Sequence, residues 1–212
     1  MKNSKLNLEA EISLQKIQKI HDVSHKIAFY AERASDWNHY SNIIDELISV
    51  HKIDIYYITS DSNDPLLLNK NKNIFAYYIG YDDIRTVFFQ TLQFKVFVTT
   101  TPDLGKFNFI RSPFDVHYVY VFSSLVSAHI GYMHDAFDNY DSVLCLGPHQ
   151  HNELKALEQH YGLKRKEIVD CGYGHLENII NSLSDGDTVL TNKMVEKVLN
   201  KSTQNADIYD LT

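Results

Sequence analysis

The sequence has few cysteines, no long apolar run and no excess of basic residues, and each of these absences excludes a class of protein. Only two cysteines occur among the 212 residues, Cys145 and Cys171, and both lie in segments that we expect to be buried strands. Their predicted role is small apolar packing in a reducing compartment, not a disulfide framework. The cytosol fits this cysteine usage best.

No apolar run approaches the roughly 20 residues that a membrane-spanning helix requires. The first residues, MKNSKLNLEAEIS, lack the apolar core of a signal peptide. We therefore expect a cytoplasmic protein that is soluble or peripheral to the inner face of the cell membrane. Acidic residues outnumber basic residues by 27 to 20, for a formal charge of -7, so a broad attraction to nucleic acid is not expected.

Several catalytic and cofactor motifs are also missing. No G-x-S-x-G elbow occurs, which disfavours a Ser-His-Asp hydrolase. The dinucleotide fingerprint G-x-G-x-x-G is incomplete, because Glu177 stands where a third glycine would follow Gly172 and Gly174. His149 and His151 have no further ligand at a recognisable metal-binding spacing. The sequence therefore predicts no nicotinamide cofactor and no bound metal.

Seven short apolar segments, separated by helical patterns, make up most of the chain. They span residues 26–32, 54–60, 74–80, 95–101, 117–122, 142–147 and 167–172. Near-continuous apolar strands that alternate with helices are typical of a mostly parallel sheet with helices on both faces. The sequence therefore predicts an α/β, Rossmann-like sandwich, and the chain is long enough for one such domain.

An amphipathic helix is predicted before the sheet, over residues 1–25, because apolar residues recur there at helical spacing: Leu6, Ala10, Leu14 and Ile17. We expect it to pack on the core of the domain, and a membrane-surface or partner-binding role is the alternative. The Rossmann-like domain is then predicted over residues 26–183. Residues 184–212, polar apart from a helical patch at 194–199, are predicted to be a linker or tail.

The last three strands all end in small, polar or histidine residues, and a helix follows each of them. HYVYVF runs into SSLVSAH, SVLCLG into PHQHNE, and EIVDCG into YGHLEN. In a parallel sheet these junctions share one edge, where open α/β folds bind ligands. We expect the chemistry there, close to His129, His149 and His175. Glu32 and residues 99–103 lie on the same predicted edge, where they either line the crevice or cap turns.

His129 is the candidate catalytic residue. It lies in a loop that also contains Ser123, Ser124 and Ser127. An imidazole can remove a proton from an acceptor hydroxyl, while serine hydroxyls and exposed backbone N–H groups can bind phosphate oxygens. A histidine that is only hydrogen-bonded within its loop is the alternative interpretation.

The other two junctions contain candidate ligand contacts. His149 lies at the predicted start of a helix, where unpaired N–H groups and the helix dipole favour an anion or a hydroxyl-bearing ligand. A turn with solvated histidines is the alternative. Gly172 belongs to a tight strand-to-helix turn in which the backbone can approach a ligand closely. The predicted substrate-binding residues are therefore Ser124, Ser127, His149, Gly172 and His175.

Within residues 26–182, five segments are informative together: KIAFYAERASDWNHYSNIIDEL, YYITSDSNDPLL, VTTTPDL, HYVYVFSSLVSAHIGYMHDAFDNYDSVLCLGPHQHNEL and CGYGHLENI. In these segments the chain resembles the N-terminal half of bacterial CDP-glycerol glycerophosphotransferase-like proteins, which act in surface-carbohydrate and teichoic-acid biosynthesis. Two positions depart from the family pattern. Ile130 follows the candidate base where glycine is frequent, and Ser123 stands where similar sequences have histidine.

The resemblance implies one half of a GT-B architecture, in which two Rossmann-like domains face each other across the active site. This half would be the acceptor side of an enzyme that transfers glycerol phosphate from a nucleotide-activated donor such as CDP-glycerol to a hydroxyl of a surface polymer. By its place after the fifth strand, His129 would be the base. The donor would bind a C-terminal domain or a partner chain, since nothing after Leu183 resembles a donor domain. No cofactor is implied.

Two other functions remain open. The first is a non-catalytic, single-domain module that binds a glycan or a partner chain. The second is half of a GT-B glycosyltransferase or of a nucleotide-sugar epimerase, because the same fold serves those reactions. A domain that faces another one also exposes apolar surface, which is compatible with a homo-oligomer.

Overall fold

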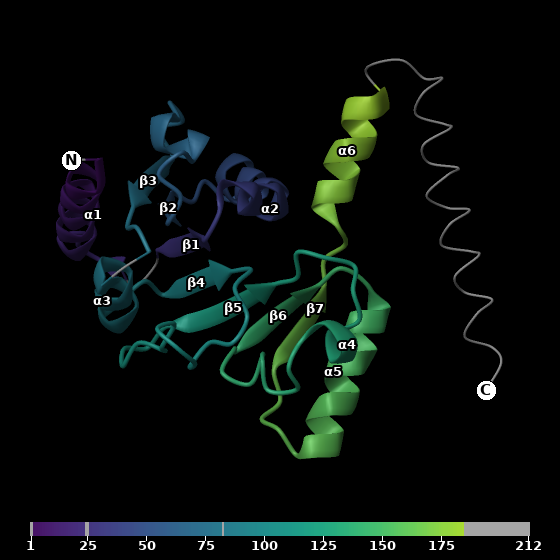
Figure 1. The fold of residues 1–212 in the computed structure, drawn as a ribbon. Helices are drawn as coiled ribbons and strands as arrows, with labels where there is room; N and C mark the ends of the chain where they lie inside the picture. The colour runs from purple at the N-terminus through teal and green to yellow at the C-terminus, as the bar shows by residue number, and fades with distance from the viewer. Residues whose placement is uncertain (1, 24–25, 82, 185–212) are drawn as a thin grey trace. The chain divides into compact units, whose positions relative to one another are not determined.

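A computed structural model describes residues 2–23, 26–81 and 83–184 of the chain. Its centre is a sheet of seven strands, all parallel, in the order β3-β2-β1-β4-β5-β6-β7 (Figure 1). The strands are β1 (Ile27–Ala31), β2 (Ile55–Thr59), β3 (Ile74–Tyr78), β4 (Val96–Thr99), β5 (His117–Val121), β6 (Ser142–Cys145) and β7 (Glu167–Asp170). All seven predicted strands are present, and the predicted α/β, Rossmann-like fold is confirmed.

Within the described residues, six α-helices and two short 3₁₀ helices accompany the sheet. They are α1 (Lys2–Gln18), η2 (Ala34–Asp36), α2 (Trp37–Ser49), η3 (Pro65–Leu68), α3 (Asp83–Thr91), α4 (Ala128–Gly131), α5 (Pro148–Tyr161) and α6 (Gly174–Ser184). Across the described part of the chain, no helix is both long and apolar enough to cross a membrane. The described residues up to Tyr173 form one compact unit, and those from Gly174 onward belong to a second.

The two faces of the sheet bury separate cores because successive residues of a strand point to opposite sides. Tyr30 of β1 belongs to the larger core, which also contains residues of α1, α3 and α5: Ile17, Phe88, Phe89 and Leu154. Its neighbour Phe29 belongs to the second core, which Tyr40 and Ile44 of α2 cover. Helices therefore pack on both faces, as the apolar strands predicted.

Two details differ from the sequence expectations. The first helix ends at Gln18, and it could not extend to residue 25 because Asp22 has a φ of 54°, which a right-handed helix cannot contain. Cys145 is buried at the end of β6, but Cys171 lies one residue beyond β7 and is exposed. β7 is an edge strand with a single neighbour, which leaves much of it accessible. The predicted patch at 194–199 lies outside the described residues.

The order of the strands reverses between β1 and β4, and a buried tyrosine joins the two strand ends there. The Tyr40 hydroxyl donates to the backbone oxygen of Tyr30 at 2.7 Å and accepts from the backbone N–H of Thr100 at 2.8 Å. Because Tyr40 is fully buried, these backbone groups have no access to water as a substitute partner. One hydroxyl thus holds together the two strands that border the switch point.

We expect Tyr40→Phe to lower the free energy of unfolding by about 1–3 kcal/mol, because it leaves a buried backbone N–H without its partner. Chemical denaturation measures this change. Tyr161→Phe is the matched control: Tyr161 is 51% exposed, and its loss of a hydroxyl should change stability by less than about 0.5 kcal/mol. Equal effects of the two substitutions would contradict the role given to the Tyr40 hydroxyl.

Candidate functional site

The junctions after β5 and β6 are tied together by one buried side chain. Gln150, in the first turn of α5, is 0% exposed. Its Oε1 accepts from the backbone N–H of Leu146 at 2.9 Å, and its Nε2 donates to the backbone oxygens of Ser124 and Val126 at 2.9 and 3.0 Å. All the hydrogen-bonding capacity of the amide group except one lone pair is used. The loop that contains the candidate base is therefore held against the start of α5.

The turn after β7 is joined to the same loop. The Tyr173 hydroxyl donates to the backbone oxygen of Ser123 at 3.1 Å, and the Tyr173 ring stacks on His39 of α2 with ring centres 6.0 Å apart. On α5, His151 Nδ1 lies 3.1 Å from Asp170 Oδ1 at the end of β7. Because of these contacts, the loop after β5, the start of α5 and residues 170–173 form one connected surface at the carboxyl edge of the sheet.

His129 belongs to a three-residue chain of hydrogen bonds with Ser127 and Glu153. Its Nδ1 lies 2.7 Å from Ser127 Oγ, which donates to Glu153 Oε1 at 2.8 Å. The second carboxylate oxygen of Glu153 accepts from the backbone N–H of Ala128, the first residue of α4. Glu153 lies on α5, so a rigid helix orients both the short helix α4 and the ring of His129.

The direction of these bonds assigns the proton on the ring. Ser127 has a single hydroxyl proton, which it donates to Glu153, so its oxygen accepts from Nδ1–H of His129. In the neutral ring, Nε2 then carries the lone pair and is the basic atom. The side chain of His129 is 56% exposed, so a substrate can reach the ring. The geometry suits a general base.

The same geometry disfavours Ser127 as a nucleophile. In a serine hydrolase the serine faces one ring nitrogen and the acid faces the other. Here Ser127 Oγ and Glu153 Oε1 both lie on the Nδ1 side of His129, at 2.7 and 3.4 Å. This arrangement agrees with the absence of a nucleophile elbow in the sequence.

The pKa of Glu153 is lowered in the fold. Burial alone would raise it, but the hydrogen bonds from Ser127 and from the backbone N–H of Ala128, together with the nearby ring of His129, outweigh burial. Glu153 is therefore a carboxylate at neutral pH, as its role as a double acceptor requires.

The remaining predicted site residues have different surroundings. Ser124 contributes its backbone oxygen to Gln150, and His149 is exposed in the first turn of α5, with its ring against Gly147. Gly172 has a φ of 75° and open space where a side chain would lie, as expected for a glycine turn. His175 lies in the first turn of α6, in the second unit. Their role in substrate binding stays a prediction.

Gln150 and Glu153 are the two important residues that the sequence reasoning missed. The sequence does contain a pattern that could have identified them. Positions 150, 153, 154 and 157 lie on one face of the helix, and Leu154 and Leu157 on that face pack against the core. Polar residues on the core-facing stripe of a helix need buried partners. Here those partners are the loop after β5.

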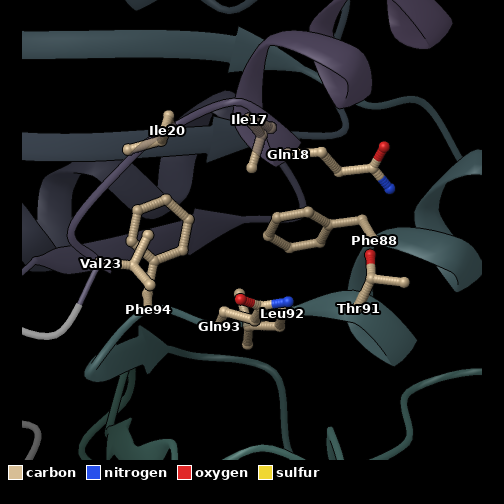
Figure 2. Close-up of a pocket in the computed structure, with 9 residues that line it drawn as sticks. All are labelled: Ile17, Gln18, Ile20, Val23, Phe88, Thr91, Leu92, Gln93 and Phe94. Carbon is tan, nitrogen blue, oxygen red and sulfur yellow. The ribbon is translucent and has the colours of Figure 1, made fainter.

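The described residues contain no group of three or more His, Cys, Asp or Glu side chains that could hold a metal ion. A cavity of about 280 Å³ lies between the end of α1 and the end of α3 (Figure 2). Its lining is mainly apolar, and none of its side chains ionises: Ile17, Gln18, Ile20, Val23, Phe88, Thr91, Leu92, Gln93 and Phe94. This cavity therefore has no group for acid–base chemistry.

The proton assignment gives a direct prediction. In the neutral ring of His129, long-range ¹H–¹⁵N NMR should detect the proton on Nδ1. Ser127→Ala removes the acceptor and should shift the tautomer toward Nε2–H. Ser182→Ala, on α6, is the control and should leave the His129 signals unchanged. A neutral wild-type ring with its proton on Nε2 would contradict the assignment.

The lowered pKa of Glu153 gives a pH dependence of stability. Because the folded pKa lies below the ordinary value of 4.5, ionised Glu153 stabilises the fold above that value, and this contribution is lost as the pH falls through the lowered pKa. The difference in unfolding free energy between wild type and Glu153→Gln should therefore be largest at neutral pH and shrink in acid. Glu11→Gln, at an exposed position of α1, should show no such trend.

Comparison with known proteins assigns no family to this chain. No protein-family model matches it, and neither a curated protein nor a solved structure does. What is established is the parallel α/β, Rossmann-like fold with its connected carboxyl edge.

Proposed function

We propose that this chain is the acceptor-side domain of a CDP-glycerol-type glycerophosphotransferase. Its role would be to bind the hydroxyl-bearing end of a surface polymer and to activate that hydroxyl. The observation that carries the proposal is the Ser127–His129–Glu153 chain, which leaves Nε2 of His129 as an accessible base at the carboxyl edge. The sequence resemblance supplies the donor class.

The proposed step is a phosphoryl transfer. His129 Nε2 takes the proton of the acceptor hydroxyl while the acceptor oxygen forms a bond to the phosphorus that bears glycerol. The bond from that phosphorus to the CMP oxygen breaks, and CMP leaves with the electron pair. The imidazolium that forms is stabilised by Glu153 through Ser127, because the carboxylate keeps its negative charge throughout. The donor nucleotide would be held by a donor domain or a partner chain.

The test is CMP release from CDP-glycerol by the protein in the form in which it occurs in its source cells, whose size an immunoblot establishes. We expect His129→Ala to lower transfer by a factor of about 10²–10⁴, the usual contribution of a general base. Glu153→Gln should lower it less and shift the acid limb of the pH–rate profile, because it weakens the support of the imidazolium. This chain alone should turn over little donor.

His160→Ala is the control, since His160 lies in the last turn of α5 and has no role in the step. Unchanged transfer by His129→Ala would refute the proposal. Stronger competition by UDP than by CMP would favour a glycosyltransferase or epimerase half. Glycan or partner binding without any transfer would favour the non-catalytic module.

A further inference from the structure

A second cavity lies at the switch point of the sheet. Its volume is about 300 Å³, and it opens beyond the carboxyl ends of β1 and β4, the neighbours between which the strand order reverses. Tyr30 of β1 and Glu32, which follows β1, line one side, and residues 101–103, which follow β4, line the other. Open α/β sheets place their ligand crevice at this point. The cavity is separate from the Ser127–His129–Glu153 chain.

The charges that line this cavity balance one another. Two are positive, Arg85 and Lys106, and two are negative, Glu32 and Asp103. Arg85 lies 3.3 Å from Glu32, and Lys106 lies 2.9 Å from Asp103. The Nε of Arg85 is buried and has no hydrogen-bond partner within the part of the chain that the structure describes. Arg85 therefore keeps one hydrogen-bond donor that the described residues leave unpaired.

Aromatic rings form the apolar part of the cavity. Phe89 and Phe109 pack with ring centres 4.7 Å apart, and the Phe109 ring also lies against Tyr30. Phe107 stands at the rim, 90% exposed, with an unfavourable φ of 52°. Its turn is closed by a hydrogen bond from the N–H of Phe109 to the oxygen of Lys106. An exposed aromatic ring held in a strained turn gains little for the fold itself.

The side chains that line the cavity indicate which class of ligand fits it. An anion would approach the carboxylates of Glu32 and Asp103, and a cation would approach Arg85 and Lys106. A purely apolar ligand would desolvate all four charges without replacing their hydrogen bonds. We propose that the cavity binds a neutral, polyhydroxylated unit, a sugar or a sugar alcohol, whose C–H face packs on Phe107. This inference rests on the proposed function, in which the unit would belong to the acceptor polymer.

The cavity is linked physically to the segment that follows the candidate base. Lys106 Nζ donates to Asp135 Oδ1 at 2.6 Å, and the backbone N–H of Asp103 donates to the oxygen of Ala136 at 2.9 Å. Asp135 and Ala136 lie between α4 and β6. A sugar bound here would therefore contact a loop that is braced against the segment after α4, the helix that contains His129, which suits one acceptor molecule that extends along the edge.

The test is a ¹H–¹⁵N NMR titration of the full chain with ribitol, glucose and N-acetylglucosamine as neutral probes, and with inorganic phosphate and choline as charged probes. We expect at least one neutral probe to shift the backbone amides of Glu32 and of residues 103–109. Phe107→Ala should raise the dissociation constant for that probe about tenfold. Phe114→Ala is the matched control, because Phe114 is an exposed phenylalanine of the same loop that does not line the cavity.

Glu32→Gln keeps an acceptor oxygen but upsets the charge balance, so it should weaken neutral binding and admit phosphate. The proposal is overturned if no neutral probe shifts these amides, if phosphate or choline shifts them more strongly, or if the two phenylalanine variants bind equally. The NMR shifts measure binding alone and do not depend on glycerophosphate transfer. His129→Ala should bind the neutral probe normally, so loss of transfer and loss of sugar binding can be told apart.

Discussion

The rest of this molecule depends on one constraint. At the carboxyl ends of the buried parallel strands, backbone N–H and C=O groups no longer pair with a neighbouring strand and need other hydrogen-bond partners. A helix or loop begins at once after each strand, so side chains supply those partners. Tyr40 serves the ends of β1 and β4, and Gln150 serves the ends of β5 and β6. Tyr173 serves the loop after β5. Polar groups therefore gather at this edge for structural reasons, whether or not a ligand binds there.

Much of the fold could be predicted from the sequence because its strands are nearly continuous apolar runs of similar length. Such runs, separated by helical patterns, leave few topologies other than a parallel sheet covered on both faces. The end of the first helix was predicted less well, since apolar spacing continues past Gln18 while the backbone turns at Asp22. The spacing of apolar residues predicts which face of a helix is buried, but it does not predict the residue at which the helix ends.

The candidate site could be predicted only in part. His129 and Ser127 were identified because they follow an apolar strand directly, which is a local signal. Glu153 was missed because its importance comes from a contact made across 26 residues of sequence. At the switch-point cavity, Glu32 and residues 101–103 were already candidates for the crevice, but Arg85, Lys106 and the aromatic lining were missed, since they join Glu32 only when the sheet forms. Local sequence patterns can identify single candidate residues, but only the folded structure shows which of them are in contact.

The charge of the chain bears on what the carboxyl edge can recognise. With a formal charge of -7, long-range electrostatics opposes the approach of a polyanion, so an acceptor rich in phosphate would need compensating local contacts. The switch-point cavity contains two cationic side chains, Arg85 and Lys106. Each already forms an ion pair with a carboxylate within 3.3 Å. A neutral unit avoids this competition because its hydroxyl groups can donate to the carboxylates and accept from Arg85 and Lys106 at once. For the proposed acceptor, electrostatics and hydrogen-bond complementarity thus favour an uncharged bound unit, with any charged part of the proposed polymer left in solvent.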